Sequence, residues 1–78
     1  MEPGIKQSKL IGENIRRNRC AQKLTQEQLS AKLQVVDCDI SRGTLAKIES
    51  GIRHISVREL EAIKHILDMD YKDFFKNE

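Results

Sequence analysis

A short pattern of apolar and polar positions recurs four times along the chain. An apolar residue precedes a Ser, Thr or Asp, and a second apolar residue follows four positions after that polar residue. The polar side chain can accept a hydrogen bond from an amide of the first helical turn, and the two apolar residues can pack together across that turn. The pattern therefore predicts four helix starts, at Leu24-Thr25…Leu29, Ile40-Ser41…Leu45, Ile55-Ser56…Leu60 and Met69-Asp70…Phe74. Two of them add a capping box, Thr25 with Gln28 and Ser56 with Glu59.

The spacing of the apolar residues agrees with helices throughout. Ile11, Ile15 and Arg19 lie four positions apart and share one face of an opening helix. Gly51 is suited to end the third helix in the left-handed conformation. No segment alternates with the period of a strand, since Val35-Val36 is too short. The sequence predicts one all-α domain over residues 1–78, with five helices at about 8–22, 25–33, 41–50, 56–67 and 70–75.

The length and composition allow one small globular core. A chain of 78 residues buries only about 60% of the surface that its unfolded form exposes, so dimerisation would be a natural supplement to its stability. Its 38% hydrophobic content is too high for a disordered chain. No apolar stretch approaches the ~20 residues of a membrane span, and no signal peptide is recognisable. We expect a cytoplasmic protein that does not enter a membrane.

The side chains that carry metal or catalytic chemistry are few and scattered. Cys20 and Cys38 form no C-x-x-C motif, and His54 and His65 lie far from both. Metal ligands would come in clustered pairs, so we expect two reduced thiols, no metal and no cofactor. No Ser, Cys or His has a plausible base beside it, and so short a chain lacks the walls of a substrate pocket. The sequence argues against an enzyme.

The charges are unevenly distributed, although the net charge is only +2. Residues 1–24 carry +4 and residues 41–58 carry +3, whereas residues 25–40 carry −2 and residues 59–78 carry −3. Such basic segments suit a polyanion. Ordinary solvated helix faces would explain them equally well when they are taken alone.

The third predicted helix has an unusual exposed face. With Leu45 at the centre of the buried face, a step of 100° per residue places Gly43, Lys47 and Ser50 on the opposite side, with Arg42 and Ala46 at its margins. A helix that enters a major groove about 12 Å wide needs small residues for close approach and cations that reach guanine. Glycine within a helix costs about 1 kcal/mol of stability relative to alanine. This cost indicates that the absence of a side chain at Gly43 serves a purpose, such as close approach to the bases. The alternative is that Gly43 is merely tolerated in the first turn.

Two opposite charges are predicted to face inward. Glu49 lies about 40° from Leu45 by the helical step, and Arg19 lies on the buried stripe of the first helix. An unpaired buried charge costs several kcal/mol, so we expect a structural ion pair between them. The alternative is that both side chains turn out to solvent.

The residues in these helices resemble a known family. The runs Leu24–Leu29 and Leu45–Gly51, with Ile11-Gly12…Ile15-Arg16…Arg19 before them and Ser56…Glu59-Leu60…Leu67 after them, resemble the Cro and phage-repressor type of helix-turn-helix, also called the Xre family. The resemblance covers about residues 10–75 and implies a five-helix, lambda-repressor-like domain that binds DNA.

The resemblance also implies roles for individual residues. Arg42, Gly43, Thr44 and Lys47 would face base edges, while the phosphate contacts would come from Gln26, Ser41, Ser50, Arg53 and His54. An ion pair like that of Arg19 with Glu49 occurs in relatives. One departure is the turn between the second and third helices, where residues 34–39 make the connection several residues longer than usual and without Gly. This acidic segment should point away from phosphates.

Three classes of function follow, in decreasing order of support. The first is a sequence-specific regulator of transcription, expected to be a repressor that binds a palindromic double-stranded DNA operator as a homodimer. The second is an antitoxin or a protein-interaction adaptor of the same fold, with a toxin as partner, using Tyr71, Phe74 and Phe75 near the acidic end of the chain. The third, an enzyme, has the least support.

Overall fold

The computed structural model of the protein describes the backbone of residues 3–77 and the side chains of residues 7–77. Its elements are four α-helices, α1 (Pro3–Ala21), α2 (Gln26–Val35), α3 (Arg42–Ser50) and α4 (Val57–Leu67), followed by a 3-10 helix, η1 (Tyr71–Phe75). No strand occurs over residues 3–77, so the predicted all-helical class is confirmed. The predicted five α-helical segments are confirmed only for the first four, because the fifth, at about 70–75, forms a 3-10 helix of five residues.

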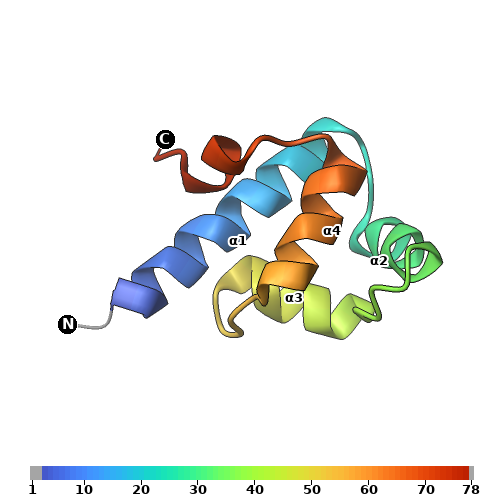
Figure 1. Ribbon diagram of the computed structural model, residues 1–78, viewed down its shortest axis with the longest axis horizontal. Helices are drawn as coiled ribbons and strands as arrows, with labels where there is room; N and C mark the ends of the chain where they lie inside the picture. Colours follow the sequence, from blue (N-terminus) through green and yellow to red (C-terminus); the bar gives the residue numbers. More distant parts are fainter. Residues whose placement is uncertain (1–2, 78) are drawn as a thin grey trace.

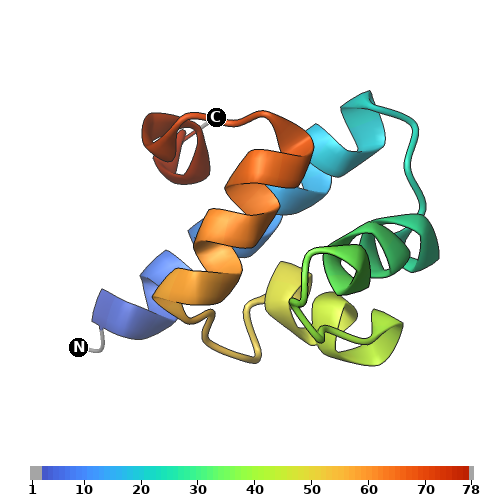
Figure 2. The same cartoon turned by 45° about the vertical axis from the view of Figure 1, so that its right-hand side comes forward.

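The long α1 runs diagonally across the molecule, and the other elements pack around it (Figure 1). It contacts α3 from Gly12, near its middle, to Arg19 in its last turn, while η1 packs against it at Asn14. The short helices α2 and α3 lie together at one side, and α4 crosses in front of α1 and contacts α2 (Figure 2). Helix α3 and the η1 segment lie on opposite sides of α1 (Figure 1).

The helix starts are where the repeated sequence pattern places them. The hydroxyl oxygens of Thr25 and Ser56 accept hydrogen bonds from the backbone amides of Gln28 and Glu59 at 3.0 and 3.1 Å. In return, the side-chain oxygens of Gln28 and Glu59 accept from the backbone amides of Thr25 and Ser56, both at 2.9 Å. Ser41 caps α3 in the same way, accepting from the Thr44 amide at 3.2 Å. The apolar pairs of all four starts lie in the hydrophobic core or pack against it. Local chemistry thus sets these boundaries.

The helix ends follow one backbone geometry with different residues. Gly51 ends α3 in the left-handed conformation, as expected, with φ of 81°. Three other residues adopt a left-handed φ without being glycine: Lys23 (61°), Asp37 (62°) and Asp68 (55°). At each of these four helix ends, the residue that follows the left-handed one donates its amide N–H to the carbonyl oxygen five positions before it. These donor residues are apolar or carry a thiol: Leu24, Cys38, Ile52 and Met69. The apolar contact compensates for the strain at the non-glycine residues.

The predicted helix bounds differ from the observed ones mainly at α1 and α2. The first helix begins at Pro3 rather than near Ser8, because proline suits the first helical position, where no N–H bond is required. Helix α2 extends to Val35, two residues beyond the predicted end. In the last helix, Phe74 is fully buried, so it is not part of the protein-contact surface predicted for Tyr71, Phe74 and Phe75, whereas Phe75 is exposed.

A buried amide, which the sequence did not single out, ties the C-terminal segment to α1. The side chain of Asn14 is 1% exposed, and its Nδ2 donates to the carbonyl oxygens of Phe74 and Lys76 at 2.8 and 2.9 Å. Its Oδ1 accepts from Arg17 Nη1 at 2.8 Å. A buried polar group of this kind must be satisfied, so the amide fixes the chain end in one position.

Helix α1 approaches the end of α3 so closely that one position requires glycine. A Cβ at Gly12 would lie 2.3 Å from the Ile48 carbonyl oxygen and 2.5 Å from that of Glu49. Both obstacles are backbone atoms and cannot swing aside. By contrast, a Cβ at Gly43 would meet nothing within 4 Å.

We therefore expect Gly12→Ala to lower the free energy of unfolding by about 2–3 kcal/mol, through overpacking at a backbone contact. The matched variant, Gly43→Ala, should instead raise it by about 0.5–1 kcal/mol, because alanine is the better helix former. Urea denaturation followed by circular dichroism measures both. Equal effects of the two substitutions would contradict the close approach of α1 and α3.

Candidate nucleic-acid interface

Helix α3 presents a small, cationic face to solvent. Leu45 and Ile48 are fully buried, whereas Arg42, Gly43, Lys47 and, at the C-terminal end, Ser50 are exposed. Neither Arg42 nor Lys47 forms an ion pair with the side chains of residues 7–77. The two cations therefore keep their hydrogen-bonding capacity for a ligand.

The hydroxyl groups at the two ends of α3 are held by the helix itself. Ser41 Oγ donates to Thr44 Oγ1 at 3.1 Å while it caps the Thr44 amide. Ser50 Oγ donates to the Lys47 carbonyl oxygen at 3.1 Å. Each oxygen retains lone pairs, but its proton would have to turn from these bonds to reach a phosphate.

Arg19 and Glu49 form an ion pair where α1 meets α3. Arg19 Nε and Nη2 donate to the two carboxylate oxygens of Glu49 at 2.7 and 3.0 Å, and the side chains are 9% and 3% exposed. Nη1 donates to the Leu24 carbonyl oxygen at 2.7 Å. The bond from Glu49 raises the pKa of Arg19 further above its ordinary value, against the effect of burial. The guanidinium thus joins α1, the segment that leads into α2, and α3.

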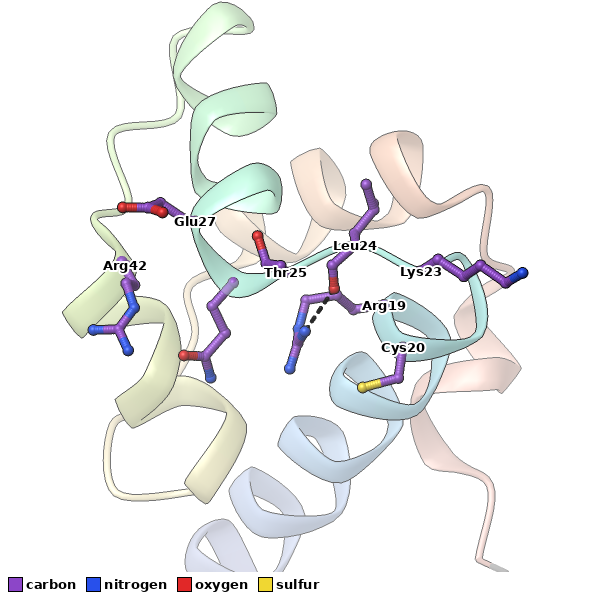
Figure 3. Close-up of a pocket in the computed structure, with 8 residues that line it drawn as sticks. Arg19, Cys20, Lys23, Leu24, Thr25, Glu27 and Arg42 are labelled. Carbon is purple, nitrogen blue, oxygen red and sulfur yellow. Dashed lines mark hydrogen bonds between the residues drawn. The ribbon is translucent and has the colours of Figure 1, made fainter.

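Gln26, the expected phosphate contact at the start of α2, belongs to the same network. Its Nε2 donates to Glu49 Oε1 at 3.1 Å. A primary amide carries two N–H donors, so this bond orients the side chain and leaves the second N–H for another acceptor. Figure 3 shows the adjoining shallow groove, with Arg42 on one side, Lys23 and Cys20 on the other, and the bond from Arg19 to Leu24 between them.

Arg53 and His54, the expected phosphate contacts beyond α3, already have protein partners. Arg53 Nη1 and Nη2 donate to the two oxygens of Glu59 at 3.0 and 2.9 Å, and this contact is the main reason that the pKa of the Glu59 carboxyl lies below its ordinary value. His54 Nδ1 lies 2.7 Å from the hydroxyl of Ser8, on α1. These contacts hold the loop between α3 and α4 beside α1, and they reduce the net charge that Arg53 offers.

Two capped helices joined by a turn, with the second one exposing small and basic residues, form the geometry of a helix-turn-helix. A family model described as Helix-turn-helix matches residues 15–74, which is more than half of the chain. The chain belongs to the Cro/C1-type helix-turn-helix family. No curated protein and no solved structure gives a match. Family membership indicates a DNA-binding regulatory domain.

In this helix-turn-helix domain, α2 and α3 are the paired helices. The long turn between them departs from the family pattern, yet it is firmly anchored. Asp37 takes the left-handed position, while Cys38 and Ile40 are buried in the core. Ser30 Oγ on α2 donates to the Ile40 carbonyl oxygen. The extra residues therefore do not loosen the start of α3, and the acidic side chains of Asp37 and Asp39 stay exposed.

The remaining sequence expectations concern thiols, metals and membranes. Cys20 is exposed and Cys38 is buried, and both are free thiols. Among the residues described, no group of His, Cys, Asp or Glu side chains is arranged to hold a metal ion. None of the helices over residues 3–77 combines the length and apolar character that a membrane crossing requires.

We expect Arg19→Ala to destabilise the domain by about 3–5 kcal/mol, because it leaves the Glu49 carboxylate buried without its cation. Replacing both partners, as Arg19→Met with Glu49→Leu, should cost much less than the sum of the single changes. Thermal and urea unfolding of the wild type, Arg19→Met, Glu49→Leu and the double variant measure this coupling, and Arg19→Ala is measured beside them. A melting temperature unchanged by Arg19→Ala would contradict the structural role of the pair.

Proposed function

We propose that this protein is a sequence-specific regulator of transcription, acting as a repressor, which reads double-stranded DNA by placing α3 in the major groove. One observation carries the proposal: the exposed face of α3 combines uncommitted cations, Arg42 and Lys47, with small residues that let the backbone approach the bases. A face without bulky or acidic side chains suits a groove about 12 Å wide.

Base recognition is assigned to Arg42, Gly43, Thr44 and Lys47. The two cations can donate to guanine O6 and N7, Thr44 can serve as donor or acceptor, and Gly43 removes the bulk that would separate α3 from the bases. The capping bond from Ser41 supports these roles, because it fixes the first turn of α3, which carries three of the four residues.

Phosphate contacts are assigned to Gln26, Ser41, Ser50, Arg53 and His54. The orientation of Gln26 by Glu49 supports its role, since the bond leaves the second N–H of the amide available to a phosphate. Arg53 is paired with Glu59, so it would act through its remaining N–H donors and neutralise less phosphate charge than an unpaired arginine. Such contacts set affinity and register, whereas the base contacts set specificity.

A homodimer on a palindromic operator completes the proposal. Dimers of this type bind half-sites about one turn of DNA apart. Apolar side chains that a partner copy could cover include Val57 on α4 and Tyr71 and Phe75 on η1, all of which are exposed. Isologous contact through such a patch would also compensate for the small core.

Selection from a random pool of DNA duplexes tests the function directly. We expect the purified protein to enrich a palindromic sequence, and Lys47→Ala to relax its preference at one base pair per half-site by about 1–3 kcal/mol. Lys72→Ala, which removes an exposed cation from η1, serves as the matched control and should select the same sequence. The absence of any enriched duplex for the wild-type protein would refute the proposal.

Gly43→Ala separates DNA binding from stability. The added methyl group meets no protein atom within 4 Å, so the folded domain accommodates it. We expect a variant that is slightly more stable but binds the selected duplex at least about tenfold more weakly, equivalent to about 1.4 kcal/mol. Fluorescence anisotropy with the selected duplex measures the affinity. Unchanged affinity would mean that glycine is merely tolerated at this position.

The exposed aromatic residues of η1 favour a second candidate, an antitoxin or adaptor that binds a protein such as a toxin. Tyr71 and Phe75 are 48% and 45% exposed, and the η1 segment that carries them lies across α1 from α3 (Figure 1). Co-purification with the product of a neighbouring toxin-like reading frame, lost in Tyr71→Ser with Phe75→Ser, would support it. The antitoxin role is compatible with DNA binding, because the two surfaces are separate.

A further inference from the structure

A shallow groove runs between α1 and the exposed face of α3, and it contains a cation that none of the assigned DNA contacts includes. The groove has a volume of about 310 Å³. It is lined by side chains from three helices: Glu13 and Arg16 of α1, Gln26 of α2, and Ala46, Glu49 and Ser50 of α3. We call it the α1–α3 groove.

The exposed cation of this groove is uncommitted. Arg16 is exposed and forms no ion pair with any side chain of residues 7–77. Its neighbour Arg19, one turn later on α1, is buried and held by Glu49, and Arg53 is held by Glu59. Arg16 therefore differs from these two arginines in keeping its full charge and its hydrogen-bonding fork for a ligand.

The remaining lining of the α1–α3 groove suits an anion. The carboxylate of Glu49 at its base is neutralised by Arg19 and also accepts from Gln26, so it does not present an unpaired charge. Gln26 and Ser50, two of the residues assigned to phosphate, are neutral and line the same groove. Gln26 has a second N–H to donate, and Ser50 can donate once its hydroxyl turns from the Lys47 carbonyl oxygen. Arg16 supplies the positive charge that these two side chains lack. Glu13 is the adverse charge, one turn earlier on α1.

The position of the groove beside α3 indicates the kind of anion. An α-helix with its side chains is about 10–12 Å wide, which nearly fills the major groove, so the phosphates of both strands pass along its two sides. One strand must therefore run past the edge of α3 that faces α1. That edge includes Ala46 and Ser50, which share the groove with Arg16.

We propose that the α1–α3 groove binds a backbone phosphate of the operator, with Arg16 as the cationic ligand beside Gln26 and Ser50. The inference rests on the proposed function, because it assumes that α3 lies in the major groove. It extends the DNA interface from the helix-turn-helix pair to α1, and it assigns Arg16 to affinity rather than to base recognition.

The dependence of DNA affinity on salt tests this assignment. Each phosphate contact contributes about 0.9 to the slope of log affinity against log salt. With the selected duplex, we expect Arg16→Gln to bind more weakly than the wild type at low salt. When the salt rises from 50 to 200 mM, the factor by which its affinity falls should be about three- to fourfold smaller than the factor for the wild type. Glu13→Gln, which removes the adverse charge, should bind more tightly. Lys72→Gln on η1 is the matched control and should leave the slope unchanged.

The outcomes distinguish this inference from the proposed function. Melting temperatures close to that of the wild type establish that the exposed substitutions leave the fold intact. An unchanged salt slope in Arg16→Gln, or an altered base preference on renewed selection, would overturn the inference while DNA binding stands. A wild-type protein that selects no duplex would overturn both.

Discussion

The buried ion pair between Arg19 and Glu49 is the contact on which the arrangement of the proposed DNA-binding surface depends. One guanidinium bonds both oxygens of Glu49 on α3 and the Leu24 carbonyl at the entrance to α2. Because Arg19 belongs to α1, the pair fixes three helices relative to one another. Its directional bonds are a stronger constraint on orientation than apolar packing, which tolerates small rotations.

The same carboxylate also links structure to function. Glu49 accepts from Gln26, so the amide proposed to meet DNA is oriented by the group that holds α3 in place. The charge of Glu49 would repel phosphates if it were unpaired, and Arg19 neutralises it. The domain thus places an acidic residue directly beneath a cationic surface without weakening that surface. On the proposed DNA-binding surface, the uncommitted cations Arg42, Lys47 and Arg16 would attract a polyanion.

A chain this small holds its helices with local devices as much as with its core. Each of α2, α3 and α4 begins at a polar cap flanked by apolar residues that pack in or against the core. Each α-helix ends in a left-handed residue, which only at Gly51 is glycine. These devices also explain how the long turn before α3 is accommodated. The left-handed conformation of Asp37 changes the direction of the chain. The side chains of Cys38 and Ile40 are buried in the core, and that of Asp39 between them is exposed.

The sequence by itself determined the helix starts, the helical class and the exposed face of α3, because each depends on residues within about five positions of one another. It also predicted that Arg19 and Glu49 face inward, from helical geometry alone. Only the tertiary structure decided that Gly12 must lack a side chain, that Asn14 holds the chain end, that Glu59 pairs with Arg53, and that Arg16 lies beside Gln26 and Ser50. The contacts of Gly12, Asn14 and Arg16 join residues 10 to 60 positions apart, so the packing angles of the helices create them. The bond from Arg53 to Glu59 spans only six positions, but it depends on how the loop between α3 and α4 folds. No local pattern in the sequence encodes those angles.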